Sequence, residues 1–387
     1  MRIALIASRL RTGGGRVVGE KTAEHLALLC PDSDLLIVRP QGVPYEYHDH
    51  VGIRELECPR QSLLAQYWWD RRILQATLRD FQPEWVWSLA NYPVAGPWRQ
   101  SLLIHDPHLT FDQSHFQDQT WKIRVKKWLG RRMLLSRIGL PRRFYCQTTA
   151  IRSSACRQLG IPLQKVGLYP PGIETIDPAG SAPGGFMGTS SPAVDTVRQA
   201  AGKFVLFYPA RGYKHKNHRL IVETYSRFHR ELAGTRCFLT ISASDHETAA
   251  EAIRRIDAEQ LGALVNLGPI SRDEVAAIFG MSDALLMPTK LETFGIPFVE
   301  AMQSRTPIIT TNFDFVRAVC RDAALYLDSP DDPEELKNAI LQLTGDQARC
   351  RELADRGSAI AQSLPTWSDV VRSVLNEEGI PHAITSP

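Results

Sequence analysis

The sequence lacks the features that define several protein classes. No stretch approaches 18 consecutive uncharged apolar residues, so we predict no membrane-spanning helix. The opening residues, MRIALIASRL, lead straight into an apolar strand-like run and lack the longer apolar segment of a signal peptide. The seven cysteines are scattered without a CxxC pair. This spacing argues against a disulfide framework or a cysteine-ligated metal and favours reduced thiols in a cytoplasmic protein.

The remaining composition is that of a globular protein with an uneven distribution of charge. Apolar residues make up 43% of the 387 residues and charged residues 22%, which excludes a disordered or collagen-like chain. The net charge is +3, but residues 1–180 carry 24 basic and 16 acidic side chains, whereas residues 181–387 carry 21 and 26. A basic half joined to an acidic half suggests two domains with different partners, one of them anionic.

Both halves alternate short apolar runs with helical patterns. The expected strands are 3–7, 35–38, 85–88, 101–104 and 144–148, followed by 204–208, 238–241, 264–267, 284–287 and 307–310. Helices are expected over 17–29, 62–81 and 366–378. Residues 177–192, between the halves, are rich in Gly, Pro and Ser, as in a linker. The pattern predicts two parallel-sheet α/β lobes with a ligand cleft at the carboxyl ends of the strands.

A glycine cluster, Gly13-Gly14-Gly15, stands between the first predicted strand and the first predicted helix. Glycines at this place let backbone N–H groups approach a phosphate or a sugar at a helix N-terminus. The GxGxxG spacing of dinucleotide-binding folds is absent, so a plain tight turn is the alternative.

A basic loop follows the predicted strand 204–208. Before a helix that starts near Asn217, this loop presents Arg211, Lys214, His215, Lys216 and His218. Cations just after a strand suit a diphosphate, because Arg can bond in a bidentate manner and Lys acts as a point charge. The alternative is a solvated basic loop without a ligand.

The segment KLETFGIPFVEAM, residues 290–302, combines two carboxylates with a helix start. Glu292 stands before the helix that Gly295 and Pro297 introduce, and Glu300 lies on an early turn. The first amides of a helix have no intrahelical partner. One place therefore offers carboxylates for sugar hydroxyls and a positive helix end for phosphate. The alternative is a surface helix with two unrelated acidic residues.

Together these motifs resemble family 4 glycosyltransferases of the GT-B fold. The Glu-x7-Glu motif (Glu292, Glu300) begins 76 residues after the lysine of an Arg-x4-Lys pair (Arg211, Lys216). Further fragments in the family's order are IHD (104–106), CQTTAIR (146–152), YPPGIE (169–174), YPARGYKHKN (208–217), NLGPISRDEV (266–275), DAALYLD (322–328) and TWSD (366–369). The resemblance covers nearly the whole chain and is weakest in the linker and over 43–98.

The resemblance implies a role for each motif residue. Arg211 and Lys216 would neutralise the donor diphosphate. Glu300 would bind the ribose hydroxyls, and Glu292 would hold hydroxyls of the donor sugar. His105 would lie by the reacting carbon, a buried core histidine being the alternative. The other implied donor contacts are the amides of Phe294, Gly295 and Ile296 beside the sugar, the backbone at Leu267 and Gly268 against the nucleobase, and Gly14 and Gly15 against the diphosphate.

The resemblance also implies an architecture and a reaction type. Two Rossmann-like domains would span 1–178 on the acceptor side and 203–365 on the nucleotide-sugar side. A linker would span 179–202, and a helix and tail at 366–387 would pack back on the first domain. Transfer would retain the anomeric configuration and need no bound metal or other cofactor. Asp32-Ser33-Asp34 has the DxD spacing of metal-dependent transferases, but it follows Pro31 and we interpret it as a capping turn.

Residues 119–143 contain nine basic and no acidic side chains. Trp121, Val125, Trp128 and Leu129 recur within this segment at helical spacing. A basic amphipathic helix with tryptophans suits an anionic membrane surface. No nucleic-acid-binding module is recognisable, so nucleic acid is not expected as a partner. The alternative is a core-packed helix with a solvated basic face.

The expected activity is transfer of a sugar from a nucleotide-sugar donor to a hydroxyl of a glycan or lipid-linked acceptor. The YPARGYKHKNH stretch resembles mannosyltransferases, which favours GDP-mannose as the donor. Such an enzyme of polysaccharide biosynthesis would be cytoplasmic, with a peripheral position on the inner face of the membrane. A nucleotide-sugar epimerase of the same fold and a non-catalytic sugar-nucleotide binder are the alternatives.

Overall fold

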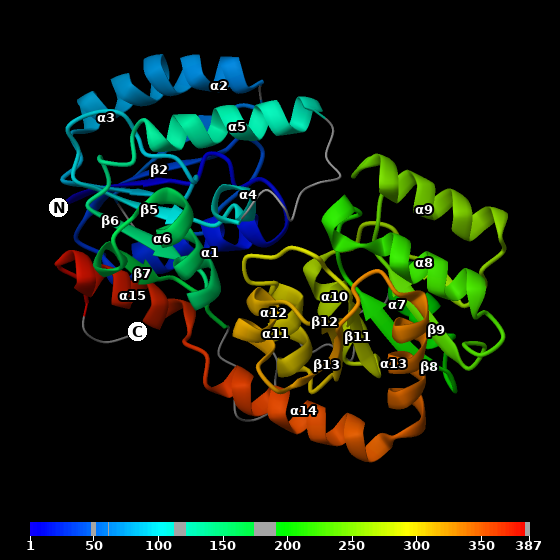
Figure 1. Ribbon diagram of the computed structural model, residues 1–387. Coiled ribbons are helices and arrows are strands. Elements are labelled where there is room, and N and C mark those ends of the chain that lie inside the picture. The colour runs from blue at the N-terminus through cyan, green and yellow to red at the C-terminus, as the bar shows by residue number, and fades with distance from the viewer. Residues whose placement is uncertain (48–51, 61, 112–120, 174–190, 384–387) are drawn as a thin grey trace. The chain divides into compact units, whose positions relative to one another are not determined.

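The computed structural model describes residues 1–47, 52–60, 62–111, 121–173 and 191–383. The chain divides into two compact units, each built on a parallel β-sheet. Unit 1 comprises Met1–Gly172 and Pro365–Pro387, and unit 2 comprises Ile173–Leu364 (Figure 1). The carboxy-terminal segment therefore belongs with the amino-terminal sheet.

Unit 1 has a seven-stranded sheet in the order β3-β2-β1-β4-β5-β6-β7, with every neighbouring pair parallel. Its strands are β1 (Arg2–Ile6), β2 (Asp34–Pro40), β3 (Ile53–Cys58), β4 (Trp85–Ser88), β5 (Gln100–Ile104), β6 (Arg143–Cys146) and β7 (Val166–Leu168). The strand order reverses direction between β1 and β4. Ligands of open parallel sheets bind at the carboxyl ends of the strands at such a switch point.

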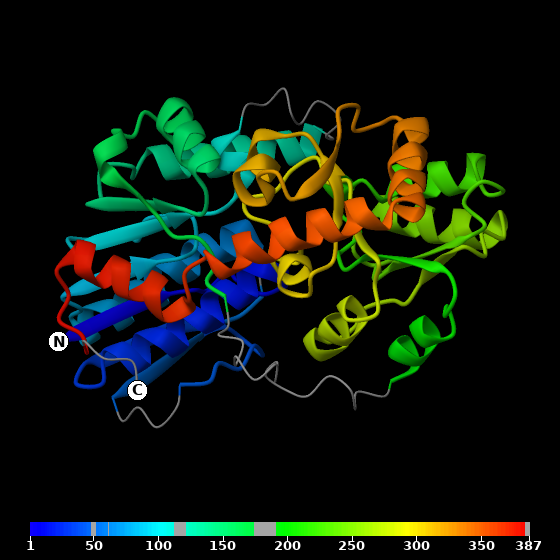
Figure 2. The ribbon, with the colours of Figure 1, turned by 90° about the horizontal axis from the view of Figure 1, so that it is seen from below.

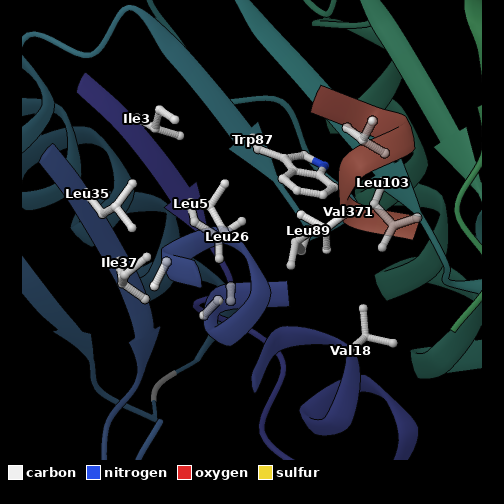
Figure 3. Close-up of a cluster of buried hydrophobic side chains, with 14 of the residues drawn as sticks. Ile3, Leu5, Val18, Leu26, Leu35, Ile37, Trp87, Leu89, Leu103 and Val371 are labelled. Atoms are coloured by element: carbon white, nitrogen blue, oxygen red, sulfur yellow. The ribbon is translucent and has the colours of Figure 1, made fainter. Parts of the chain in front are cut away.

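Alternate side chains of these strands enter two cores on opposite faces of the sheet. Ile3 and Leu5 pack with α1 (Gly13–Leu29) and α15 (Trp367–Glu378), which lie side by side on one face (Figures 2 and 3). Ala4 and Ile6 face the other core. The helices that follow in this unit are α2 (Leu63–Trp69), the π-helical turn η1 (Asp70–Leu74), α3 (Gln75–Phe81), α4 (Pro107–Thr110), α5 (Trp121–Leu135) and α6 (Thr149–Leu159).

A buried carboxylate fastens α15 to the sheet of unit 1. The Glu378 carboxylate accepts hydrogen bonds from the Ser101 hydroxyl at 2.6 Å and the Tyr145 hydroxyl at 3.2 Å. It also pairs with the Arg99 guanidinium at 3.4 Å. A carboxylate buried with several partners is costly to remove, because its partners stay buried without it.

We expect Glu378→Ala to lower the free energy of unfolding by about 2 kcal/mol, since it leaves two buried hydroxyls without their acceptor and removes the counter-charge of Arg99. Glu377→Ala is the matched control, because Glu377 is the more exposed neighbour and its ion pair is with Arg143 near the surface. Urea unfolding of both variants measures the difference. Equal stabilities for the two variants would contradict the role of Glu378 as the anchor of α15.

Unit 2 has a six-stranded parallel sheet in the order β10-β9-β8-β11-β12-β13. Its strands are β8 (Phe204–Tyr208), β9 (Thr235–Leu239), β10 (Leu264–Asn266), β11 (Ala284–Met287), β12 (Ile308–Thr311) and β13 (Ala324–Leu327). Its helices are α7 (Pro192–Arg198), α8 (His218–Arg227), α9 (Glu247–Ala258), α10 (Arg272–Phe279), α11 (Ile296–Gln303), α12 (Asp314–Cys320), α13 (Pro333–Gly345) and α14 (Gln347–Gln362). The switch point of this sheet lies between β8 and β11.

The linker and the first helix differ from their predicted bounds. The linker predicted at 179–202 includes α7, whose Val194 and Val197 are buried in unit 2; residues 179–190 lie outside the described residues. Ser191 caps this helix by accepting a hydrogen bond from the amide of Val194, and the Pro at the first helical position is also favourable. The first helix starts at Gly13 rather than at 17, so the glycine cluster forms its first turn.

Candidate active site

Lys216 and Glu292 form an ion pair at the switch point of the unit 2 sheet. Lys216 follows β8 and Glu292 follows β11, the two strands that flank the switch point. The Lys216 Nζ contacts the Glu292 Oε1, which also accepts a hydrogen bond from the Thr289 hydroxyl at 3.3 Å. The side chains of Lys216 and Glu292 are only 16% and 12% exposed. The sequence motifs thus meet at the place where a parallel sheet binds its ligand.

Backbone contacts hold the loops of this ion pair together. The Lys290 amide donates to the carbonyl of His215 at 2.8 Å, and the Tyr208 hydroxyl donates to the carbonyl of Lys216 at 2.9 Å. Burial, reinforced by the nearby Glu292 carboxylate, raises the pKa of Tyr208 well above its usual value. Tyr208 therefore remains a neutral hydrogen-bond donor.

Arg211 is held at the same edge of the sheet by a carboxylate. Its guanidinium lies 3.6 Å from Asp245, and the Asp245 carboxylate also accepts the amide hydrogens of Gly212 at 2.9 Å and Ser242 at 3.0 Å. The Arg211 side chain is 48% exposed, whereas that of Asp245 is 7% exposed. Asp245 therefore orients an arginine that remains open to solvent.

His218 does not belong to the exposed cations that the sequence predicts for this loop. Its ring is buried and stacks on Tyr208 with 4.7 Å between ring centroids. Burial lowers its pKa to about 3, so the ring is neutral at physiological pH. His218 therefore adds no positive charge to this loop, in contrast to Arg211, Lys214 and Lys216.

The start of α11 has a glycine that other residues could not replace without strain. Gly295 caps the helix with φ of +82°, in the left-handed region, and a Cβ there would come within 2.6 Å of the Phe298 ring. Phe294 is buried, so its contribution to a ligand site would come from its backbone. The amide of Ile296 opens the helix and has no intrahelical acceptor.

Glu300 lies further along α11 in a largely desolvated place. Its carboxylate has no hydrogen-bond or ion-pair partner among the described residues. Burial raises its pKa, an effect that Arg272 partly opposes. A desolvated carboxylate without a protein donor is suited to accept hydrogen bonds from a ligand's hydroxyl groups.

Leu267 and Gly268 follow β10 at the carboxyl edge of the same sheet. The Leu267 amide donates to the carbonyl of Leu239 at 2.8 Å, and the Gly268 amide donates to the Asn266 side chain at 3.2 Å. Gly268 has φ of +72° and open space at its Cα. Gly268 therefore leaves room beside the backbone of this turn.

The remaining predicted site residues belong to unit 1. Gly14 and Gly15 form the first turn of α1, and His105 follows β5. A Cβ on Gly15 would lie 3.7 Å from the His105 ring, so these two positions are neighbours. The His105 Nε2 lies 3.0 Å from the carbonyl of Leu89, and burial lowers the pKa of His105 to about 4. A neutral ring with Nε2–H donating to that carbonyl satisfies the geometry.

Sequence reasoning missed Asp245 and Thr289, which position Arg211 and Glu292. Both follow strands, β9 and β11, at the edge where the other site residues lie. The sequence signal for these two residues was a carboxylate and a hydroxyl placed shortly after predicted strands. Among the described residues no group of three or more His, Cys, Asp or Glu side chains could hold a metal ion. Asp32 lies in the turn before β2, and Asp34 is the first residue of that strand.

Similarity to proteins of known structure identifies the fold. A glycosyltransferase from Rickettsia africae ESF-5 superimposes with a TM-score of 0.73 at 15% identity, covering 97% of each chain. Together with the two parallel sheets, this likeness shows that the chain has the GT-B fold.

Residues 195–359, which lie within unit 2, match the family described as "Glycosyl transferases group 1". The chain is 34% identical over 85 residues to the O-antigen chain mannosyltransferase RfbU of Salmonella typhimurium, covering 22% of this chain and 24% of the relative. It is 29% identical over 111 residues to O-antigen chain mannosyltransferase B of Escherichia coli, covering 28% of each. The matched segments thus span about a quarter of the length of these curated relatives.

Proposed function

We propose that the protein is a retaining glycosyltransferase that moves a sugar from a nucleotide-sugar donor to a hydroxyl of a glycan or lipid-linked acceptor. The ion pair of Lys216 and Glu292 at the switch point is the observation that carries the proposal. It combines a cation for a leaving diphosphate with a carboxylate for sugar hydroxyls, beside the start of α11. The match of residues 195–359 to the group 1 glycosyltransferases supports the same reaction class.

The chemistry asks little of side-chain acids and bases, because the diphosphate needs no proton to leave and its departing oxygen takes the proton of the acceptor hydroxyl. Negative charge grows on that diphosphate as the bond to the sugar breaks, so fixed cations and helix amides lower the barrier. Lys216 and Arg211 supply the cations, and α11 supplies amide hydrogens and the positive end of its dipole. When the donor arrives, Lys216 exchanges part of its contact with Glu292 for the diphosphate, and Glu292 turns to the sugar hydroxyls.

We assign mannose as the sugar and GDP-mannose as the donor. The resemblance of the YPARGYKHKNH stretch supports this choice, as do the two O-antigen mannosyltransferases among the relatives. Thermal-shift titration with a panel of GDP-, UDP-, ADP- and dTDP-sugars tests it. GDP-mannose should raise Tm most, and a larger shift with another nucleotide sugar would reassign the donor. Recovery of an epimerised donor in the absence of acceptor would instead identify an epimerase.

A peripheral position on an anionic membrane is a further part of the proposal. On α5, Val125, Trp128 and Leu129 are 45–50% exposed, so these apolar side chains do not pack in the core. Arg132 lies over the Trp128 ring, 5.0 Å from its centroid. Figure 1 shows α2, with the exposed Trp68, on the same side of unit 1 as α5. Among the described residues no helix has the length and apolar character needed to cross a bilayer.

We expect the protein to bind anionic vesicles and to dissociate as salt rises, since each basic residue near the surface contributes about 1 kcal/mol. Replacing both Trp128 and Leu129 by Ala should weaken sedimentation with phosphatidylglycerol vesicles. Leu163→Ala is the matched control, because Leu163 is similarly exposed but lies outside α2 and α5. Equal sedimentation with anionic and neutral vesicles at low salt would refute membrane binding.

A further inference from the structure

Unit 1 contains a cavity of about 380 Å³ at the switch point of its own sheet. Its walls come from the residues that follow β1 and β4 and from the α2–η1–α3 segment and α5, all within unit 1. None of the positions implied by the family resemblance lines it. The volume is within the usual range of small-molecule sites, and the place is where a parallel sheet binds ligands.

The cavity is lined by four arginines and a single carboxylate. Arg9 lies 3.4 Å from Asp70, so this pair is close to neutral. Arg71, Arg79 and Arg137 have no carboxylate within ion-pair distance among the described residues. Asp70 also interacts electrostatically with Arg137, so four guanidinium groups share one carboxylate and a net of three positive charges remains in one concave site.

Two of these arginines have orienting contacts. The Arg71 guanidinium donates to the Tyr67 hydroxyl at 2.8 Å, and the Arg137 guanidinium donates to the carbonyl of Pro93 at 3.5 Å. Neither contact neutralises the charge, and each leaves other N–H groups of the guanidinium available. Preorganised arginines with spare donors are suited to bidentate binding of phosphate oxygens.

The helix that carries Asp70 and Arg71 has an unusual backbone. Asp70–Leu74 form the π-helical turn η1 between α2 and α3, and such turns occur frequently at functional sites. Asp70 is fixed within it by the Gln66 amide at 2.9 Å and by Arg9. The adjoining Gln75 side chain donates to the carbonyl of Ala95, which closes the cavity from the β4 side.

We infer that this cavity binds a phosphate or diphosphate group, and that this group belongs to the acceptor. A net of three positive charges matches a group with two or three negative charges better than a single carboxylate. The acceptor role rests on the proposed function, since unit 2 holds the residues assigned to the donor. The binding of phosphate by unit 1 does not depend on that function.

Calorimetry with inorganic pyrophosphate tests the site. The titrations use protein with both Lys216→Ala and Arg211→Ala, in which the two cations assigned to the donor diphosphate are absent. In that background, Arg71→Gln with Arg137→Gln should weaken pyrophosphate binding roughly 100-fold, about tenfold for each charged contact. Arg72→Gln is the matched control, because Arg72 is the next residue on η1 but stacks on Trp68 outside the cavity. Equal affinities in the double variant and the control would overturn the inference.

Arg79→Gln is a second test if the double variant fails to fold, because the Arg79 side chain is exposed. It should weaken pyrophosphate binding about tenfold. Displacement of pyrophosphate by mannose 1-phosphate would assign a soluble acceptor, and displacement by phosphatidic acid vesicles would assign a membrane lipid. Displacement by neither would refute the acceptor role. Nucleotide-sugar binding by the otherwise native protein reports separately on the proposed function, so the two failures are distinguishable.

Discussion

Lys216→Ala should lower the turnover number by roughly 10²–10³-fold, the usual effect of losing one preorganised charge at the leaving group. The side chain is 16% exposed and lies at the switch point, so water cannot fully replace it. Arg211→Ala should act in the same direction, because Asp245 holds that guanidinium at the same edge of the sheet. Release of nucleoside diphosphate from the donor measures both effects.

Lys214→Ala is the matched control for these variants. Lys214 belongs to the same basic loop, but its side chain is exposed and it is not assigned to the diphosphate. Its removal should change turnover less than about threefold, since an exposed charge is largely screened by solvent. Near-normal turnover for both Lys216→Ala and Arg211→Ala, with Tm preserved, would contradict their assignment to the diphosphate.

Glu300→Gln and Glu292→Gln should weaken different parts of donor binding. Glu300 is assigned to the ribose, so Glu300→Gln should weaken the free nucleoside diphosphate and the whole donor alike, by about 1.5–3 kcal/mol. Glu292 is assigned to the sugar and already pairs with Lys216. Glu292→Gln frees that lysine, so nucleoside diphosphate affinity should not fall, while turnover and discrimination between sugars should.

Calorimetry with GDP and with GDP-mannose on both variants gives the four affinities needed. Glu334→Gln is the control for loss of a carboxylate in the same unit, because Glu334 lies on the exposed first turn of α13 and has no assigned role in the site. Its two affinities should match those of the native protein. If Glu292→Gln weakens GDP as much as Glu300→Gln does, the assigned roles are wrong and the donor lies differently across the start of α11.

Glu300→Gln should also stabilise the unliganded protein at neutral pH. Burial raises the pKa of Glu300 in the folded state, so the folded protein holds the proton more tightly than the unfolded chain does. Ionised Glu300 therefore lowers the free energy of unfolding when the pH is above its pKa in the folded protein. The effect disappears when the pH is below its pKa in the unfolded chain. The gain in Tm should grow as the pH rises above the pKa of the unfolded chain and vanish below it, which distinguishes a desolvated ligand-binding carboxylate from one paired within the fold.

The sequence predicts the central strands of both sheets but not most of the edge strands. Strands β4, β8 and β11 have the predicted bounds, because central parallel strands are buried on both faces and appear as continuous apolar runs. The unpredicted strands β3, β7 and β13 are all at sheet edges. Strand β3, IRELEC, carries charged side chains because one of its sides has no neighbouring strand, and charge there discourages further pairing.

The residues of the site were predictable where their chemistry is concentrated in short motifs. Lys216 and Glu292 are 76 positions apart in sequence, yet each follows a strand next to the switch point, so topology brings them into contact. Asp245 and Thr289 were not predictable in this way, because a single polar residue after a strand is common. The arginines of the unit 1 cavity come from separate segments of the chain, and only the fold assembles them.

Cleavage of the bond between a sugar and a nucleoside diphosphate is the activity on which every assignment in unit 2 depends. It is observed most directly by ³¹P NMR of GDP-mannose incubated with the protein and a panel of glycan and lipid-linked acceptors, with Lys216→Ala protein in parallel. The acceptor hydroxyl takes the sugar as the diphosphate leaves as GDP. We predict that the diphosphate resonances of GDP appear with the native protein and grow at least about 100-fold more slowly with the variant. Donor that binds but stays intact, or that returns as an epimer still attached to its nucleotide, would contradict the proposed transfer.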